Sequence, residues 1–206
     1  SLRDEQGKWI LTPYAGEERA ADVDDLEETM MKRLPQLEIT DVLIEVDRWT
    51  GFSKQFVHAA DGSSLATEVQ LKHLYASLLA QGCNFSLAQM TRTSGFAYHH
   101  LLHTGTWFLR EETLKKANDA LVNYHHSLET SRRWGAGVLS SSDGQRFPMT
   151  GKHRNTHSIL RYFGYRRGIT FYTWTSDQFS QYGGKAVAST LRVAPEVLSE
   201  ILAKAT

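Results

Sequence analysis

The chain has 206 residues, 41% hydrophobic and 22% charged, with a formal net charge of zero, a composition that predicts one or two globular domains. No stretch approaches the ~20 apolar residues of a membrane-spanning helix, and the first residues lack the basic and apolar segments of a secretory signal. A single cysteine, Cys83, excludes internal disulfides and multi-cysteine zinc sites, so we expect a cytoplasmic protein with no membrane partner.

Residues 1–40 are expected to form an acidic connecting segment. The first 50 residues hold thirteen acidic and six basic residues. The acidic run from Asp22 to Glu28 favours the start of a short helix, because carboxylates complement the positive end of the helix dipole. The next apolar stretch, residues 42–46, is too short to distinguish a strand from a helical turn.

Residues 41–134 are expected to form a helical region. From residue 65 to 82, leucine and tyrosine side chains recur at helical spacing, with Ser64 available as a cap and Gly82 as a stop. Two shorter helices and one long helix follow, over residues 86–93, 98–108 and 110–131.

After Trp134 the pattern changes from helical to extended. Two glycines break the helix, and β-forming residues predict three strands, over residues 138–139, 158–163 and 169–175. Asp143 and Gly144 form a dipeptide typical of turns. Gly183 and Gly184 lead to a final helical pattern over residues 194–202. The predicted fold class is therefore α+β.

Three strands and one helix leave a sheet edge and a sheet face uncovered, so we expect more chain to follow Thr206. Ser1 stands where a complete protein has Met, and Thr206 follows directly on a helical pattern. The sequence therefore predicts a piece of a longer protein, and whether it is an excised fragment or a decayed gene stays open.

Residues 131–170 are strongly basic, with eight lysines and arginines and one acid, Asp143. Aromatic residues are interleaved with the basic ones, a pattern compatible with a polyanionic partner such as DNA. A solvated basic face explains the same composition, and charge alone favours that interpretation.

The other candidate motifs point to no chemistry. His99 and His103 have the i, i+4 spacing of zinc ligands, but no glutamate follows His99, and ordinary packing on a helix is the better interpretation. Cys83 has no neighbouring base to activate it. The sequence also lacks a serine nucleophile elbow and a phosphate-binding loop. From the residues alone, Asp143 and Asp177 are better explained as turn residues than as metal ligands.

Four blocks nevertheless resemble the Tn3-family transposases, in order and spacing, from about residue 40 to the end. The blocks are VDRWTGF from Val46, WFLREETL from Trp107, SSSDGQRF from Ser140, and Phe171 to Thr173 with Ser176 to Gln178. The resemblance implies a DDE transposase with an RNase H-like core. Such an enzyme uses Mg²⁺ or Mn²⁺ to cut transposon ends and join their 3′ hydroxyls to target DNA, in replicative transposition.

Carried over by position, Asp143 matches the first catalytic aspartate, a metal ligand on the first core strand. The second aspartate and the glutamate of the family lie beyond the helix that ends this chain. Residues 135–206 are therefore expected to be the N-terminal part of a truncated RNase H-like core, following the helical region 41–134. Because the metal mechanism needs several carboxylates, the chain alone is expected to be inactive.

The resemblance also suggests DNA contacts and partners. Five residues are placed to meet backbone phosphates: Gln145, Arg146, Lys152, Arg154 and Lys185. Gln178 is expected to hold the end of a strand beside Asp143. The complete enzyme is expected to be a homodimer that binds terminal inverted repeats and target DNA, associated with the bacterial nucleoid. A non-catalytic DNA-binding or regulatory remnant of a transposase remains the alternative.

Overall fold

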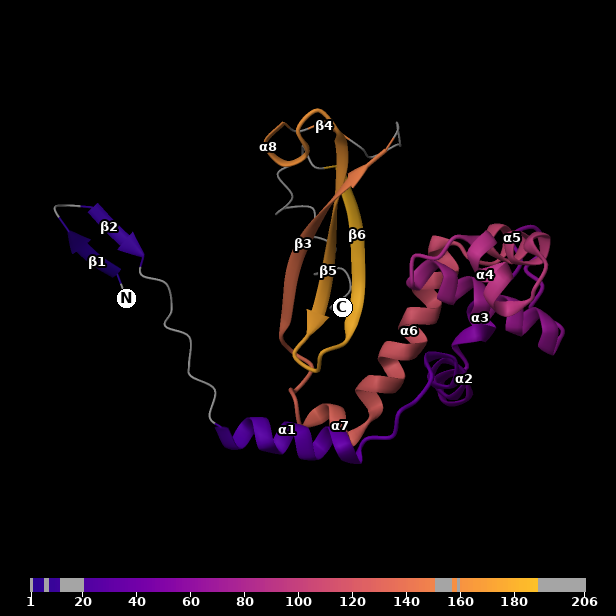
Figure 1. Cartoon of the computed structure of the whole chain (residues 1–206), viewed down its shortest axis with the longest axis horizontal. Helices are drawn as coiled ribbons and strands as arrows, with labels where there is room; N and C mark the ends of the chain where they lie inside the picture. The colour runs from indigo at the N-terminus through magenta and orange to yellow at the C-terminus, as the bar shows by residue number, and fades with distance from the viewer. Residues whose placement is uncertain (1, 6–7, 12–20, 151–156, 159, 189–206) are drawn as a thin grey trace. The chain divides into compact units, whose positions relative to one another are not determined.

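The structure is a computed structural model that describes residues 2–5, 8–11, 21–150, 157–158 and 160–188 (Figure 1). The chain divides into two compact units, Ser1–Asp41 and Val42–Thr206. In the described ranges, no helix combines the length and the apolar character needed to cross a membrane.

The first unit contains a strand pair and a helix. β1 (Leu2–Glu5) and β2 (Lys8–Leu11) pair antiparallel. The acidic run lies in α1 (Ala21–Arg33), which has Asp22 and Asp24 in its first turn and Lys32 and Arg33 in its last turn. Both ends of this helix complement its dipole, so the helix predicted from the acidic run is confirmed.

The helical part of the second unit begins with α2 (Ile39–Thr50), which shows that the ambiguous residues 42–46 are helical. After a short 3₁₀ helix, η1 (Phe52–Gln55), the chain continues through α3 (Glu68–Gly82), α4 (Leu87–Ser94), α5 (Tyr98–Trp107), α6 (Glu111–Ser127) and α7 (Glu129–Arg132). The helices predicted from periodicity are thus confirmed, with two changes at their ends.

One change concerns the start of α3. Thr67, and not Ser64, caps it: the Thr67 hydroxyl accepts from the Gln70 N–H, and the Gln70 side chain accepts from the Thr67 N–H. The other change is that residues 110–131 do not form one helix. Leu128 adopts an extended conformation, with ψ 134°, and separates α6 from α7.

Two apolar clusters form the core of these helices. The larger contains Phe52, Phe56, Leu74, Phe108 and Ala117, and the smaller Ala76, Ala80, Met90 and Leu101. Leu74, Ala76 and Ala80 all lie on α3, which therefore contributes to both clusters.

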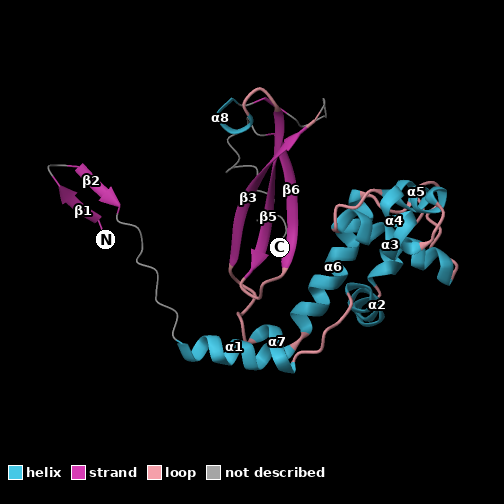
Figure 2. Cartoon of the chain, in the orientation of Figure 1, coloured by secondary structure: helices cyan, strands magenta, loops and turns pink. Residues whose placement is uncertain are grey.

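The sheet of the second unit is antiparallel and centred on β5 (Arg167–Ser176) (Figure 2). β3 (Ser140–Met149) pairs with β5 along its whole length. β6 (Gln181–Ala188) and the two-residue β4 (His157–Ser158) also pair with β5. Among the described strands, β3 pairs with β5 alone, so its outer edge faces none of them. The α+β prediction is confirmed by this sheet and the preceding helices.

Several details of the predicted strands were wrong. The first strand begins at Ser140 rather than at residue 138, and it runs through Asp143 and Gly144, which form no turn. Glycine at position 144 leaves room for the Tyr172 ring, because a Cβ there would lie 2.6 Å from the ring. In the predicted strand 158–163, Ser158 is extended, whereas α8 (Leu160–Phe163) is a helical turn.

The glycine pair was also misread. Gly183 and Gly184 lie inside β6 rather than in a loop. A Cβ on Gly184 would lie 2.8 Å from the Phe171 ring, so glycine is required by a neighbouring aromatic side chain and not by a turn. The helix predicted over residues 194–202 lies outside the described residues.

Candidate active site

Asp143 lies in a row of residues that crosses the sheet. It pairs with Thr173 on β5, and Thr173 pairs with Gly184 on β6. Residues directly opposite in neighbouring strands point to the same face. The Asp143 side chain is exposed, and its Oδ1 accepts a hydrogen bond of 2.7 Å from the Gly144 N–H. Because its neighbours in the row are small, the carboxylate stands on an open part of this face.

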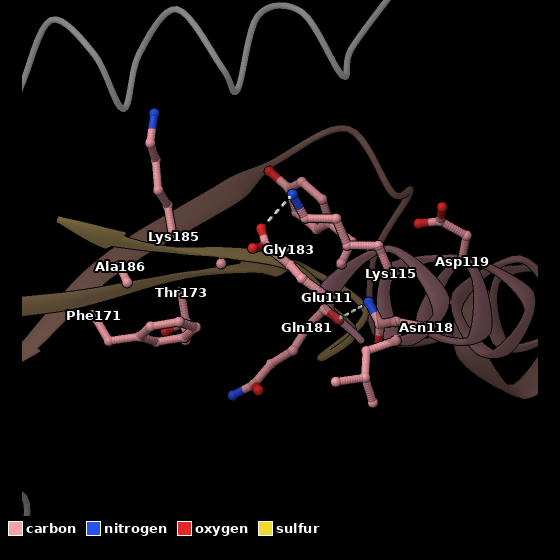
Figure 3. A pocket seen from close by; sticks show the side chains of 13 residues that line it. Glu111, Lys115, Asn118, Asp119, Phe171, Thr173, Gln181, Gly183, Lys185 and Ala186 are labelled. Carbon is pink, nitrogen blue, oxygen red and sulfur yellow. Dashed lines mark hydrogen bonds and ion pairs between the residues drawn. The ribbon is translucent and has the colours of Figure 1, made fainter. Parts of the chain in front are cut away.

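The pleat of the strands separates the predicted DNA contacts. Gln145 lies two residues after Asp143 and therefore shares its face, whereas Arg146 alternates to the opposite face. Lys185 pairs with Tyr172, which is also on the opposite face. In Figure 3 the Lys185 side chain extends away from Phe171 and Thr173. Lys152 and Arg154 lie outside the described residues.

Gln178 lies in the turn between β5 and β6, where it is 2% exposed. Its Nε2 donates a hydrogen bond of 2.9 Å to the Gly135 carbonyl. The neighbouring Asp177 accepts from the Gly137 N–H at 2.9 Å through its carboxylate and donates its own N–H to the Leu139 carbonyl at 3.0 Å. Both residues therefore fasten the loop that leads into the strand of Asp143.

The same loop contacts the end of α6. A Cβ on Gly137, which has a φ of +77°, would lie 2.6 Å from Nε2 of His126. A Cβ on Gly135 would lie 2.4 Å from Cγ of Asp177. The Ser180 hydroxyl and Nδ1 of His125 are 2.6 Å apart. Glycine is therefore needed at both positions, because the loop is packed between α6 and the turn after β5.

A pocket of about 700 Å³ opens between α6 and the strands β5 and β6 (Figure 3). Phe171 and Thr173 line it from the sheet, and Leu114, Lys115 and Asn118 line it from the helix. Asn118 joins the two walls, since its Nδ2 donates to the Gln181 carbonyl at 3.1 Å. Sequence reasoning missed this pocket because residues 50 or more positions apart form it, although an exposed aromatic residue on a strand is a signal for such a surface.

The histidines of the helical region pack against one another. His73 is buried, and its ring stacks on His100 with the centroids 4.9 Å apart. His99 lies 4.0 Å from His100. Burial lowers the pKa of His73, and the charges of His100 and His99 lower it further. This is the packing role that the sequence analysis favours for His99.

A divalent metal ion needs several oxygen ligands, and Asp143 is the candidate among the predicted residues. Within the described ranges, no three His, Cys, Asp or Glu side chains gather into a metal-binding group. Asp177 uses its carboxylate to hold the Gly137 N–H. At the position of Asp143 the described residues thus supply one carboxylate and do not by themselves complete a metal site.

The family model and similar proteins agree on one family. The family model described as the Tn3 transposase DDE domain matches residues 41–206. The chain is 37% identical over 175 residues to the transposase for transposon gamma-delta of Escherichia coli (strain K12), covering 84% of the chain and 17% of that protein. It is 35% identical over 177 residues to the transposase for transposon Tn1546 of Enterococcus faecium, covering 84% of the chain and 18% of that protein. It is also 35% identical over 170 residues to the transposase for transposon Tn501 of Pseudomonas aeruginosa, covering 82% of the chain and 17% of that protein. The chain thus spans less than a fifth of the length of these relatives.

Proposed function

The chain belongs to the Tn3 transposase family, whose DDE domain it matches over residues 41–206, and from this we propose that the complete protein cuts transposon ends and joins them to target DNA. In this proposal Asp143 is one of the catalytic carboxylates. Residues 135–206 are the N-terminal part of an RNase H-like core, residues 41–134 are a helical region that packs on it, and residues 1–40 are an acidic connecting segment.

The observation that carries the proposal is the position of Asp143 in the sheet. Its carboxylate projects from the middle of a ten-residue strand, in a row with Thr173 and Gly184. A rigid strand fixes the position of such a group better than a loop does, and small neighbours leave room for a phosphate beside it. The antiparallel order of β3, β5 and β6 supports an RNase H-like core.

The metal enters the proposal only for the complete protein. Mg²⁺ or Mn²⁺ would supply the charge that stabilises the phosphate during cleavage and joining. In the described part of the chain, Asp143 is the group that would contribute a ligand, and the partners it needs are not among the described residues. We therefore expect no strand transfer by this chain alone.

The DNA contacts divide between the two faces of the sheet. Gln145 is proposed to contact the DNA strand that lies at Asp143, because Gln145 and Asp143 share one face of the sheet. Arg146 and Lys185 are proposed to contact backbone phosphates on the other face, and Lys152 and Arg154 remain proposed contacts. We further propose a homodimer that brings two terminal inverted repeats together with target DNA at the bacterial nucleoid, with Gln178 and Asp177 positioning the strand of Asp143.

The direct test is Asp143→Asn in the complete transposase. We expect cleavage of end-containing DNA to disappear, while binding of the end in a gel-shift assay stays within about twofold, because the change removes a ligand charge and preserves the shape of the side chain. Ser142→Ala is the matched control, since Ser142 is the adjacent exposed residue of the same strand and points to the other face. Cleavage retained by Asp143→Asn refutes the proposed role.

The alternative, a DNA-binding remnant without catalysis, rests on the eight basic residues against one acid in residues 131–170. It predicts that the chain itself binds DNA without Mg²⁺ and that affinity falls steeply as salt rises from roughly 50 to 200 mM. Arg146→Ala is expected to lower the slope of log affinity against log salt by about 1. No DNA binding at low salt contradicts this alternative.

A further inference from the structure

We propose that the pocket between α6 and the sheet holds a nucleobase of the DNA strand whose phosphate lies at Asp143, with Phe171 as the surface on which the base stacks. This inference rests on the proposed function, because it assigns a binding subsite to the same substrate. The pocket measures about 700 Å³, which accommodates a base together with part of its sugar.

The pocket lies on the same side of the sheet as Asp143. Thr173 lines the pocket and is the direct cross-strand partner of Asp143. Phe171 lies two positions before Thr173 on β5, on the same face, and pairs with Gln145. Two strand residues span roughly 7 Å, so the row of Phe171 is about one nucleotide away from the row of Asp143.

One side of the Phe171 ring packs against the sheet, and the other side faces the pocket. It covers the backbone of Gly184, where a Cβ would lie 2.8 Å from the ring. Phe171 is nevertheless 40% exposed, and it lines the pocket opposite α6, where Leu114 is 39% exposed (Figure 3). A fixed aromatic face beside an apolar side chain is the arrangement on which bases of single-stranded nucleic acid stack.

The charges around the pocket favour a base over a phosphate. Glu111 and Asp119 line it from α6, and Lys115 forms an ion pair of 3.0 Å with Glu111. The Lys185 side chain extends away from Phe171 (Figure 3). Lys185 nevertheless lines the pocket as well, so two lysines balance the two carboxylates and leave no net positive charge to attract a phosphate, whereas a neutral base needs none. Asn118 adds a polar side chain to the wall, oriented by its hydrogen bond to the Gln181 carbonyl.

The experiment measures binding rather than chemistry. The protein is the complete transposase with Asp143→Asn. Its affinity is measured for intact end DNA and for end DNA that carries an abasic site at one of the two nucleotides flanking the cleavage point. Each of these two positions is tested in turn. We expect one of the two abasic substitutions to weaken binding about tenfold, the size typical of lost base stacking on an aromatic side chain. Adding Phe171→Ala is expected to remove this difference, and Phe171→Trp is expected to keep it.

Phe147→Ala is the matched control. Phe147 is also 40% exposed, lies on the same face of the sheet through its pairing with Ile169, and does not line the pocket. With Phe147→Ala the preference for the intact base is expected to persist. Circular dichroism of each variant shows whether the sheet has folded, and the Trp variant tests the stacking role even if the Ala variant does not fold.

The outcomes separate this inference from the proposed function. Binding of end DNA that is indifferent to both abasic sites, or a preference for the intact base that survives Phe171→Ala, overturns the pocket inference and leaves the transposase proposal standing. Failure to bind end DNA at all contradicts both.

Discussion

The helices of the second unit bury their own core, whereas the sheet buries one face only along β5 and β6 and leaves the other face open. In the core that the helices enclose, Phe56, Leu74 and Leu101 are at most 1% exposed. On β5, Thr170 and Trp174 are buried on one face, while Phe171 on the other face is 40% exposed. The open face is the one that carries Asp143. Stability is thus concentrated in the helices, and the proposed chemistry in a part of the sheet that packing leaves free.

The largest expected effect comes from a matched pair of Phe→Ala changes, which tests this comparison between the helices and the sheet. Phe56→Ala is expected to lower the free energy of unfolding by about 3–5 kcal/mol, because the side chain lies in the core of the helices and its removal leaves a cavity. Phe147→Ala, on the open face of the sheet, is expected to cost about 1 kcal/mol. Urea unfolding followed by circular dichroism measures both, and equal losses contradict the comparison.

A second test concerns the buried carboxylate of Asp47 in α2. Its Oδ2 accepts from the Tyr75 hydroxyl at 2.5 Å, and its Oδ1 accepts from the Ser53 N–H at 2.8 Å. Burial raises the pKa of Tyr75, and the hydrogen bond to Asp47 raises it further, so the phenol stays protonated and donates.

Tyr75→Phe is therefore expected to cost about 2 kcal/mol, the typical loss when a hydrogen bond to a charged buried group is removed. Tyr98→Phe is the control, because Tyr98 is 48% exposed. Equilibrium unfolding of the two variants gives the comparison directly. If the Tyr75 and Tyr98 variants are equally stable, the Asp47 network does not help to hold the helices together.

The smallest expected effect is a dependence of helical stability on pH through His73. Its pKa in the folded chain lies below the ordinary histidine value of 6.5, mainly because of burial, and His100 and His99 of α5 are the titratable groups that face it. The unfolded chain then binds the proton more readily, so stability falls as the pH drops below about 6.5 and is independent of this group above that value.

His73→Phe is expected to reduce the fall in stability between about pH 7 and 5, measured as the change in thermal midpoint. The ring of Phe preserves the edge contact with Phe96, whose centroid lies 4.8 Å from that of His73. An unchanged pH profile assigns the acid sensitivity to other groups.

The sequence predicted the helices better than the sheet, and the reason is the range of the interactions. Helix periodicity and caps are local, so the main error was a cap at Ser64 instead of Thr67, three residues further on. The glycines of β3 and β6 were misread, because Gly144 and Gly184 make room for Tyr172 and Phe171 on another strand. No local pattern distinguishes such a glycine from one in a turn.

The candidate site was accessible from the sequence only in part. The block around Asp143 indicated the residue through its family resemblance, and nothing in the pattern fixed the strand pairing. Without the register, the sequence could not show that Gln145 shares the face of Asp143 while Arg146 and Lys185 do not. The pocket beside Phe171 depends on the packing of α6 against β6, which is a tertiary contact.

The outer edge of β3, which pairs with none of the described strands, has a consequence for handling the protein. A strand whose edge pairs with no described strand is a template on which a second molecule can add through backbone hydrogen bonds, which leads to self-association. Proline and charged side chains oppose such addition, and β3 contains Pro148, Arg146 and Asp143. Asp143 thus contributes to solubility as well as to the proposed chemistry, and the Asp143→Asn protein, which keeps one of the two charges on this strand, is the variant most prone to aggregate at high concentration.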